Sequence, residues 1–562
     1  MHADAVRNAD MKGAVAAGHP QTAEAAIRMY ELGGNAFDAV LAALAAACVV
    51  EPVLTSLGGG GFLLARKNDA DAVLYDFFVQ TPRRRRPEAE SEFYPVIADF
   101  GTAQQEFHIG AGSIATPGTV RGLVETHKVV GSLPLKEILA PAIEFASQGV
   151  GVNALQAYIF SIVEPIYRAT PDAEALYGGE ALQGEGTLFH QPALADTLTW
   201  IAAEGDAPFY QGELAHRLVE HCRQQGGHLE RADLERYRVI PRVPLQHRYH
   251  GYRVATNPGP SSGGTLINFA LTALDNQDIA AGGFGSPAHM KTLAYVMAHT
   301  NIARQDGLLA LSQHHKQLLE AYRETVAGHP VNNRGTTHIS TIDGRGNSAS
   351  LTLSNGEGSG QLLPDTGIML NNMLGEEDLN PEGFNRWPCD VRVSSMMAPT
   401  LAEDHRHLIA IGSGGSNRLR TAILQTLCNM IDFGMPPEEA VNAPRIHFER
   451  DGLDVEPGLG PTTLDALRAQ YPGLRPWSSQ NLFFGGTHTV CWDGRNFTGA
   501  GDPRRGGVFL STGDRYSHHA GPGSGPEWHR PGPGSHCQQF LHSAEKTGIG
   551  DFFLIVVTDC IY

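Results

Sequence analysis

The sequence contains few cysteines, and they follow no pattern. None of the seven belongs to a CxxC pair or a regular framework: Cys48, Cys222, Cys389, Cys428, Cys491, Cys537 and Cys560. Neither a disulfide scaffold nor a zinc site is therefore indicated, and the histidines, although numerous, are not spaced as metal ligands. We expect no bound metal, and a reducing compartment suits this composition.

Positive charge is also scarce. The formal net charge is -18, whereas a nucleic-acid-binding protein neutralises phosphates with clustered Lys and Arg. We therefore expect no nucleic-acid partner. The one basic run, Arg83–Arg86, lies between Pro82 and Pro87, which predicts an extended surface segment with solvated side chains.

Long apolar runs are missing. Charges are scattered through the first twenty residues, which lack the continuous apolar core of a secretory signal. The most apolar helical stretch, around Ala39–Val53, is rich in alanine, includes Glu51-Pro52 and is too short to span a bilayer. We expect this stretch to be a buried helix, and the protein to be cytoplasmic without membrane association.

No linker-like segment interrupts the chain before about residue 510, which predicts one large compact body or two closely packed halves. The patterns predict a mixed α/β fold. Helix is expected over residues 22–53, broken at Gly33-Gly34-Asn35 with Asn35 capping the second part, and again over residues 118–235. Strands are expected at Phe62–Ala65, Ala72–Phe77, Tyr252–Thr256 and from residue 337 onward.

The last part of the chain has a different composition. From about Ser511, His, Gly and Pro accumulate, and an apolar run, Phe552–Val557, lies near the end. Such a composition predicts a mostly disordered extension over residues 511–562.

Residues 336–354 predict a β-hairpin. Alternating residues run into the turn Asp343–Asn347, and beyond it hydroxyl side chains occupy every second position up to Ser354. If the turn is centred on Arg345, Ser354 lies directly opposite Thr336. Opposed residues hold their Cβ atoms about 4.5–5.5 Å apart, so the two hydroxyls are expected near hydrogen-bonding range.

Thr336 has the setting of a nucleophile. A threonine hydroxyl needs a base, and a free α-amine with a pKa near ~8 can supply one from the same residue. Such an amine exists only at a chain terminus. Gly335 can adopt the strained geometry that lets the hydroxyl attack the preceding carbonyl, so cleavage after Gly335 would release the amine. Taken alone, Gly-Thr-Thr also describes ordinary strand threonines.

Several short segments extend this interpretation. With Thr336-Thr337-His338, Asp343 and Gly346-Asn347, they resemble the γ-glutamyltranspeptidases, which are N-terminal-nucleophile hydrolases. The likeness covers residues 12–508. The other segments, in chain order, are GGNAFDAV (33–40), SLGGGGF (56–62), ATPGT (115–119), PSSGG (260–264), NN (371–372), SSMMAPT (394–400), GSGGS (412–416) and GAGDPRRGG (499–507).

The resemblance implies an α/β (α+β) fold, a four-layer αββα sandwich cut into a large-subunit region, residues 1–335, and a small-subunit region, residues 336–510. The two fragments stay associated, as one copy or as a homodimer. The substrate is a small-molecule amide or peptide, and no cofactor is needed.

The resemblance also implies roles for individual residues. Thr336 is the nucleophile, and Ser354 replaces a second threonine that supports it. Backbone N–H groups of two glycines form the oxyanion hole, and two serines and an asparagine contact the substrate. These residues are Gly414 and Gly415, Ser394 and Ser395, and Asn355.

Two departures concern the substrate. The position of the arginine that binds the glutamyl carboxylate holds Phe78, and the usual Asn-Asn-Gln-Met-Asp-Asp reads Asn-Asn-Met-Leu-Gly-Glu, with Gly375 in place of an acid and only Glu376 left to bind the ammonium group. We expect poor use of glutathione unless Arg83–Arg86 or another cation reaches the pocket. Relatives resembling cephalosporin acylases, which hydrolyse glutaryl-type amides, fit better.

The segment between Asn372 and Ser394 is short for a full lid, which predicts an open cleft. An open cleft favours hydrolysis over acyl transfer.

Two other functions are compatible with parts of the sequence. Gly259–Gly263 satisfies G-x-S-x-G, so Ser261 could serve a serine hydrolase, although Pro260 restricts the preceding backbone and no helix-opening pattern follows at once. A non-catalytic binding relative of the same fold is the other alternative. His338 is expected to be a structural strand residue, because the terminal amine already supplies a base.

Overall fold

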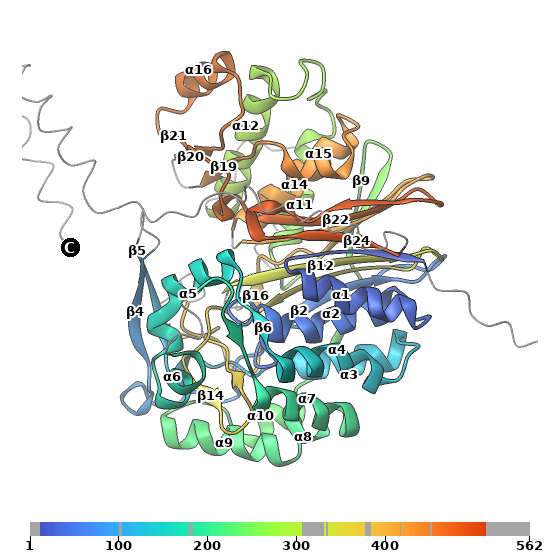
Figure 1. Ribbon diagram of the computed structural model, residues 1–562. Helices are drawn as coiled ribbons and strands as arrows, with labels where there is room; N and C mark the ends of the chain where they lie inside the picture. The colour runs from blue at the N-terminus through green and yellow to red at the C-terminus, as the bar shows by residue number, and fades with distance from the viewer. Residues whose placement is uncertain are drawn as a thin grey trace, which may run out of the picture.

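The computed structural model describes residues 12–99, 104–178, 184–305, 331–332, 335–376, 384–415, 417–449 and 452–512. Figure 1 shows two stacked sheets in the middle of the molecule, with helices covering both outer faces. The predicted mixed α/β class is therefore confirmed.

Both large sheets are antiparallel throughout. The first has seven strands, in the order β24 (Val508–Ser511), β1 (Gly13–Ala17), β12 (Thr336–Asp343), β13 (Ser348–Ser354), β2 (Gly60–Arg66), β3 (Val73–Phe77) and β8 (Ile240–Arg242). The second has six, in the order β23 (Phe497–Ala500), β22 (Gly486–Trp492), β18 (Leu408–Gly414), β17 (Thr400–Glu403), β10 (Tyr252–Thr256) and β9 (Leu245–Tyr249).

The helices form the outer layers. On the seven-stranded sheet lie α1 (Pro20–Glu31), α2 (Ala36–Val50), α3 (Thr119–Val130) and α4 (Leu135–Gln148), followed by α7 (Pro192–Glu204), α8 (Ala207–Tyr210), α9 (Glu213–Gln225) and α10 (Arg231–Arg236). On the six-stranded sheet lie α11 (Gly263–Leu274), α12 (Pro287–Gln305), α14 (Arg418–Ile431), α15 (Pro437–Asn442) and α16 (Pro461–Gln470).

Smaller elements complete the body. Helices α5 (Ala154–Tyr167) and α6 (Pro171–Tyr177) lie at the side beside the hairpin β4 (Tyr94–Asp99) and β5 (Gln104–Ile109). The remaining short strands are β6 (Val150–Gly151), β7 (Leu188–Phe189), β11 (Val331–Asn332), β14 (Leu362–Leu363), β15 (Ile368–Met369), β16 (Ser394–Ser395), β19 (Ile446–Glu449), β20 (Gly452–Val455) and β21 (Leu474–Pro476).

Helix α2 explains the alanine-rich run of the sequence. All its residues are buried, because it packs between the seven-stranded sheet and its neighbours α1 and α4, where small side chains allow close approach. Asn35 caps the helix in a capping box with Asp38, as predicted. The carboxylate of Asp343 in the hairpin turn accepts a further hydrogen bond from Ala36 N at 3.0 Å.

The predicted hairpin is confirmed to the residue. Strands β12 and β13 pair with Thr336 opposite Ser354, and the turn between them contains Gly346 with a φ of +83°. Strands β2, β3 and β10 also occur where the alternation predicted them. The hairpin lies in the middle of the seven-stranded sheet, with β1 on one side and β2 on the other.

Strands from both sides of the Gly335–Thr336 bond are present in both sheets. Strands β12, β13 and β24 share one sheet with β1, β2, β3 and β8, and the other sheet combines β9 and β10 with four strands of the later region. Fragments produced by a cut at this bond would therefore be held together by continuous main-chain hydrogen bonding.

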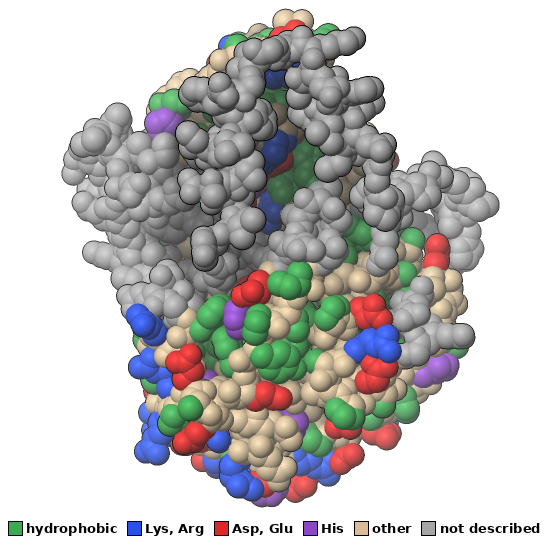
Figure 2. Space-filling model, turned by 90° about the vertical axis from the view of Figure 1, so that its left-hand side faces the viewer, with side chains coloured by type: hydrophobic (Ala, Val, Ile, Leu, Met, Phe, Trp, Pro, Cys, Tyr) green, Lys and Arg blue, Asp and Glu red, His purple; other side chains and the backbone are tan. Residues whose placement is uncertain are grey.

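The surface view and the chain end add two observations. On the described part of the face in Figure 2, acidic and basic side chains are interspersed without an extended basic patch. None of the described helices is long and apolar enough to cross a membrane. The ordered body continues to Thr512, because Ser511 pairs with Ala14 in β24; the rest of the predicted tail, residues 513–562, lies outside the described residues.

Candidate active site around Thr336

Thr336 lies where the two sheets meet. It is the first residue of β12 and is 3% exposed. At the end of β18, a Cβ on Gly414 would lie 2.3 Å from the Thr336 carbonyl oxygen. Glycine is therefore the residue that lets the end of the six-stranded sheet approach the start of β12 this closely.

Gly335 has a backbone conformation that favours glycine. Its φ is +42°, in the left-handed region, and a Cβ there would lie 1.8 Å from the Gly356 carbonyl oxygen. Both the backbone angle and the lack of space exclude a side chain. The residue before Thr336 thus has a backbone conformation that is open to glycine and costly for a residue with a side chain.

Ser354 contacts the peptide bond that precedes Thr336. Its Oγ donates a 2.5 Å hydrogen bond to the Gly335 carbonyl oxygen and accepts one from Gly356 N at 3.1 Å. A donor on a carbonyl oxygen draws electron density from the carbon and stabilises the oxyanion formed by attack on it. Ser354 is therefore placed to assist attack on the Gly335 carbonyl.

Arg505 supplies a half-buried cation next to Thr336. It lies in η6 (Pro503–Arg505), and its Nη1 donates to the Thr336 carbonyl oxygen at 3.5 Å. Burial lowers the pKa of Arg505 to about 10, against the opposing effects of Asp502 and Glu51. A guanidinium with this pKa still carries its charge at neutral pH.

The predicted oxyanion glycines lie together at the end of β18. Gly415 has a φ of +115°, and a Cβ there would lie 2.9 Å from Gly485 Cα. Its carbonyl accepts from Arg418 N at 3.1 Å, where α14 begins. The positive end of the α14 dipole therefore follows directly after the two glycines, which favours negative charge near them.

Asn355 and Glu376 lie on the wall beside Ser354. A Cβ built on Gly356 would lie 2.0 Å from Asn372 Oδ1 and 3.0 Å from Glu376 Oε1. Because the Gly356 carbonyl packs against Gly335, Gly356 lies between Glu376 and the Gly335 backbone. Asn355 is 1% exposed, and its amide has no hydrogen-bond partner among the described residues. Such a buried amide costs about 1–3 kcal/mol, and a bound polar ligand would offset that cost.

Ser394 and Ser395 form β16, which pairs in parallel with β11 just ahead of the Gly335–Thr336 bond. In the uncut chain their hydroxyls bind protein groups. Ser394 Oγ donates to Pro260 O at 2.6 Å, and Ser395 Oγ accepts from Met397 N at 3.1 Å. The segment before the bond thus lies against the strand that carries these two serines.

Phe78 does not line a polar pocket. Its side chain is fully buried between the sheets and stacks on Phe62, with ring centroids 5.3 Å apart. Its carbonyl accepts from the Tyr237 hydroxyl at 2.7 Å and from the Arg392 guanidinium. The position predicted for a carboxylate-binding arginine has therefore become part of the core.

The basic run binds surface segments. Arg83 forms an ion pair with Asp390, Arg85 Nη1 donates to Asn385 O at 2.6 Å, and Arg86 Nε donates to Gly227 O at 3.0 Å. The prediction of solvated side chains holds for Arg84 and Arg85, which are exposed, and is wrong for Arg83 and Arg86, which are half-buried. These hydrogen bonds direct the run towards residues 223–230 and 385–390.

Ser261 is placed unlike a nucleophile. It is fully buried, and its Oγ donates to Ser395 O at 2.6 Å and to Met397 O at 2.9 Å. The expectation that no helix follows is wrong, because α11 begins at Gly263. The hydroxyl is nevertheless bound to main-chain carbonyls.

His338 is also fully buried, with its ring nitrogens engaged by Thr352 Oγ1 at 2.8 Å and Ser340 Oγ at 3.0 Å. This arrangement agrees with a structural role.

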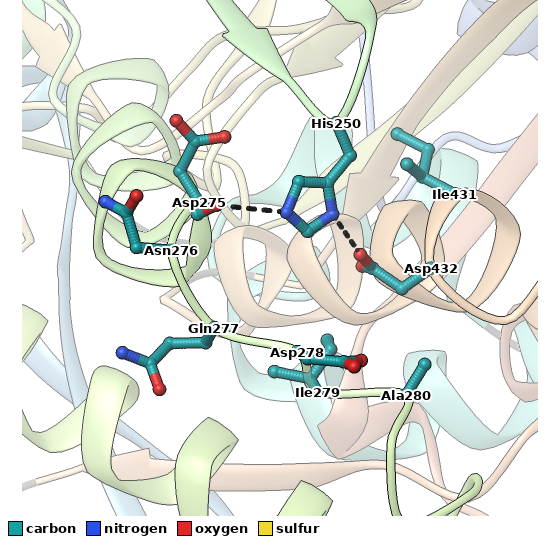
Figure 3. Close-up of a pocket in the computed structure, with 9 residues that line it drawn as sticks. All are labelled: His250, Asp275, Asn276, Gln277, Asp278, Ile279, Ala280, Ile431 and Asp432. Carbon is teal, nitrogen blue, oxygen red and sulfur yellow. Dashed lines mark hydrogen bonds and ion pairs between the residues drawn. The ribbon is translucent and has the colours of Figure 1, made fainter.

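A cavity of about 470 Å³ lies elsewhere, between the C-terminal ends of α11 and α14 (Figure 3). His250 in its wall binds Asp432 Oδ1 at 2.5 Å and Asp275 O at 3.1 Å. None of the predicted site residues lines this cavity. Among the described residues, no group of three or more His, Cys, Asp or Glu side chains is arranged to hold a metal ion.

The sequence analysis did not identify two residues that contact the start of β12, Arg505 and Glu51. Arg505 belongs to the segment GAGDPRRGG, and two adjacent arginines beside a buried aspartate could have pointed to it. Glu51 Oε2 accepts a 2.6 Å hydrogen bond from Thr337 Oγ1, directly after Thr336. Its signal was a lone acid directly after the apolar run Ala39–Val50.

The comparisons with known proteins identify the family of the chain. The family model for gamma-glutamyltranspeptidase matches residues 22–512. The chain is 30% identical over 551 residues to the glutathione hydrolase proenzyme of Escherichia coli strain K12, covering 88% of this chain and 90% of the relative. It is 31% identical over 487 residues to the acylase ACY 1 proenzyme of Pseudomonas sp. strain V22, covering 82% and 86%.

The fold is also that of a solved relative. The crystal structure of cephalosporin acylase from Bacillus halodurans superposes with a TM-score of 0.75 at 24% identity, over 89% of this chain and 96% of that chain. The two stacked sheets between helical layers form the four-layer αββα sandwich of the N-terminal-nucleophile hydrolases. From its family match, its relatives and its fold, the chain belongs to the γ-glutamyltranspeptidase family.

Proposed function

We propose that the protein cuts itself between Gly335 and Thr336 and then hydrolyses amides through an acyl-enzyme on Thr336. The observation that carries the proposal is the hydrogen bond from Ser354 to the Gly335 carbonyl, 2.5 Å long, on a glycine with a φ of +42°. The carbonyl accepts a hydrogen bond from a donor, the preceding residue is a glycine at a position with no room for a side chain, and a threonine hydroxyl follows next in the chain.

In the first step, Thr336 Oγ attacks the carbonyl carbon of Gly335. The C–N bond between the two residues breaks, the hydroxyl proton moves to the departing nitrogen, and an ester joins Gly335 to the threonine oxygen. Water hydrolyses this ester, leaving a carboxylate on Gly335 and a free α-amine on Thr336. Shared sheets then keep the two fragments together.

In the amidase step, the α-amine accepts the hydroxyl proton as Thr336 Oγ attacks the substrate carbonyl. The N–H groups of Gly414 and Gly415 stabilise the oxyanion, supported by the start of α14 and by Arg505. The departing amine takes the proton, and water releases the acid from the ester.

We propose glutaryl-type amides as the preferred substrates and γ-glutamyl amides as weaker ones. The position of the expected carboxylate-binding arginine is the buried Phe78, and Arg83, Arg85 and Arg86 bind surface segments. Glu376 and the buried amide of Asn355 remain for polar contacts with the acyl group, and Ser394 and Ser395 can contact its far carboxylate once the β11 segment has moved. Both named relatives, a glutathione hydrolase and an acylase, are compatible with this range.

The test compares glutaryl and γ-glutamyl amides of the same chromogenic amine, with and without glycylglycine as acceptor. We expect the glutaryl amide to have the higher kcat/KM, free acid to be the main product, and Thr336→Ala to be inactive on both. Faster transfer to glycylglycine than release of free acid would contradict the preference for hydrolysis. An uncut and inactive wild-type chain would instead favour a binding relative of the same fold.

A further inference from the structure

Glu51 lies at the junction between the helical layer and the start of β12. It follows directly after α2 and is 3% exposed. Both carboxyl oxygens accept hydroxyl donors: Thr22 Oγ1 on Oε1 at 2.7 Å and Thr337 Oγ1 on Oε2 at 2.6 Å. Because both contacts are short and come from separate elements, the orientation of this carboxyl group is fixed.

The contact with Thr337 acts on the residue next to the nucleophile. Side chains alternate along β12, so Thr337 points to the helical layer and Thr336 points with His338 towards the other sheet. A Cβ on Gly412 would lie 2.2 Å from the His338 ring, which confirms which face this is. Arg505 Nη1 reaches the Thr336 carbonyl at 3.5 Å. The link between Thr336 and Thr337 is thus held by two contacts, one to the Thr337 side chain and one to the Thr336 carbonyl.

Glu51 and Arg505 also interact electrostatically. Burial raises the pKa of Glu51 above its ordinary value, against the opposing effects of the Thr337 and Thr22 hydroxyls and of the charge of Arg505. Among the described residues, His488 on β22 and Cys48 on α2 are further titratable groups near Glu51. Burial lowers the pKa of His488 to about 4 and raises that of Cys48 to about 12, so both are neutral at physiological pH.

We propose that Glu51 is a positioning residue for Thr336, which it orients through Thr337 while its charge offsets that of Arg505. The proposal rests on the proposed function, in which Thr336 is the nucleophile. A tilt of the Thr336–Thr337 link moves the attacking oxygen relative to the Gly335 carbonyl before the cut and relative to the substrate after it. A displacement near 1 Å at a reacting atom costs about a hundredfold in rate.

The main test pairs Thr337→Val, which keeps the shape and removes the hydroxyl, with Thr337→Ser, which keeps the hydroxyl. We expect Thr337→Val to slow self-cleavage and to lower kcat of the cleaved enzyme about ten- to a hundredfold, with KM changed about twofold. Thr337→Ser should retain both activities within about threefold of wild type.

The matched control is Thr22→Val, which removes the other hydroxyl donor to the same carboxyl but has no covalent link to the nucleophile. We expect it to keep kcat within about threefold. Equal losses in Thr22→Val and Thr337→Val would assign Glu51 a purely structural role and overturn the proposal, as would a Thr337→Val enzyme as active as wild type.

Glu51→Gln tests the charge. Without the carboxylate, Arg505 disfavours the protonated amine of Thr336, so the acidic limb of the kcat/KM profile should shift to lower pH by about one unit. An unshifted acidic limb of the kcat/KM profile would refute the electrostatic part of the proposal. If Glu51→Gln does not fold, the Thr337 pair still decides the positioning part. An uncut wild-type chain would refute the proposed function itself, whereas a cut, active wild type with an unaffected Thr337→Val would refute only this inference.

Discussion

Removing the Ser354 hydroxyl is expected to slow self-cleavage strongly. In Ser354→Ala the Gly335 carbonyl loses a 2.5 Å hydrogen bond and Gly356 N loses its 3.1 Å acceptor. In the ground state such a bond contributes about 0.5–1.5 kcal/mol. A donor that binds a developing oxyanion contributes more, about 2.7–4 kcal/mol or 10²–10³ in rate. Because Ser354 binds the oxygen on which charge develops, we expect the larger effect on cleavage.

The assay follows the fraction of the 60.4 kDa chain that remains uncut over time, by mass spectrometry. Ser350→Ala on the same strand is the matched control. Its Oγ also donates to a carbonyl, Ile411 O at 2.9 Å, and accepts from a main-chain donor, Thr400 N at 3.0 Å, away from Gly335. We expect Ser354→Ala and Ser350→Ala to lose a similar free energy of unfolding. Only Ser354→Ala should cleave itself more slowly than wild type, by about 10²–10³-fold.

Ser354→Thr restores the hydroxyl and should cleave within about tenfold of wild type, because a threonine Oγ can make the same bond. Wild-type cleavage by Ser354→Ala would refute the role given to this hydroxyl. Equal slowing in Ser350→Ala would show that the effect comes from the strand and not from the Gly335 carbonyl.

Three further predictions concern other parts of the structure. Gly335→Ala should remain a single uncut chain by mass, since its Cβ would meet Gly356 O at 1.8 Å. Arg504→Met removes a cationic partner from two fully buried carboxylates, Glu456 at 2.6 Å and Asp502 at 3.3 Å, and should lower the urea-derived free energy of unfolding by about 3–5 kcal/mol. An unchanged urea midpoint would contradict this. Burial lowers the pKa of His250, but hydrogen bonds to Asp432 and to Asp275 O prevail and raise it (Figure 3). The stabilisation by His250 is therefore present below the ordinary pKa of histidine and is lost as pH rises through the raised pKa. His250→Gln should make Tm depend less on pH over this range, and an unchanged slope of Tm against pH would refute the prediction.

Much of the fold around Thr336 was predictable because its signals are local. Alternation over residues 336–343 and 348–354, with positive-φ turn residues between them, sets the register that pairs Thr336 with Ser354. The capping of α2 by Asn35 is equally local. The use of the Ser354 hydroxyl was not predictable, because it depends on the backbone of Gly335, which turns its carbonyl towards Ser354.

The contacts that complete the site come from distant parts of the chain. Glu51 and Arg505 contact the start of β12 from positions far away in the sequence, and no periodic pattern predicts such contacts. Phe78 illustrates another limit. Its residue type indicated the loss of a carboxylate-binding arginine, but only the packing shows the ring stacked on Phe62 in the core.

The most direct test of the whole account is intact-mass measurement with N-terminal sequencing of the purified protein, beside Thr336→Ala. The account predicts two fragments from the wild type, one of them beginning at Thr336, and a single intact chain from Thr336→Ala, which has no hydroxyl to attack the Gly335 carbonyl. A wild-type chain that stays whole, or a Thr336→Ala chain cut at the same bond, would contradict it.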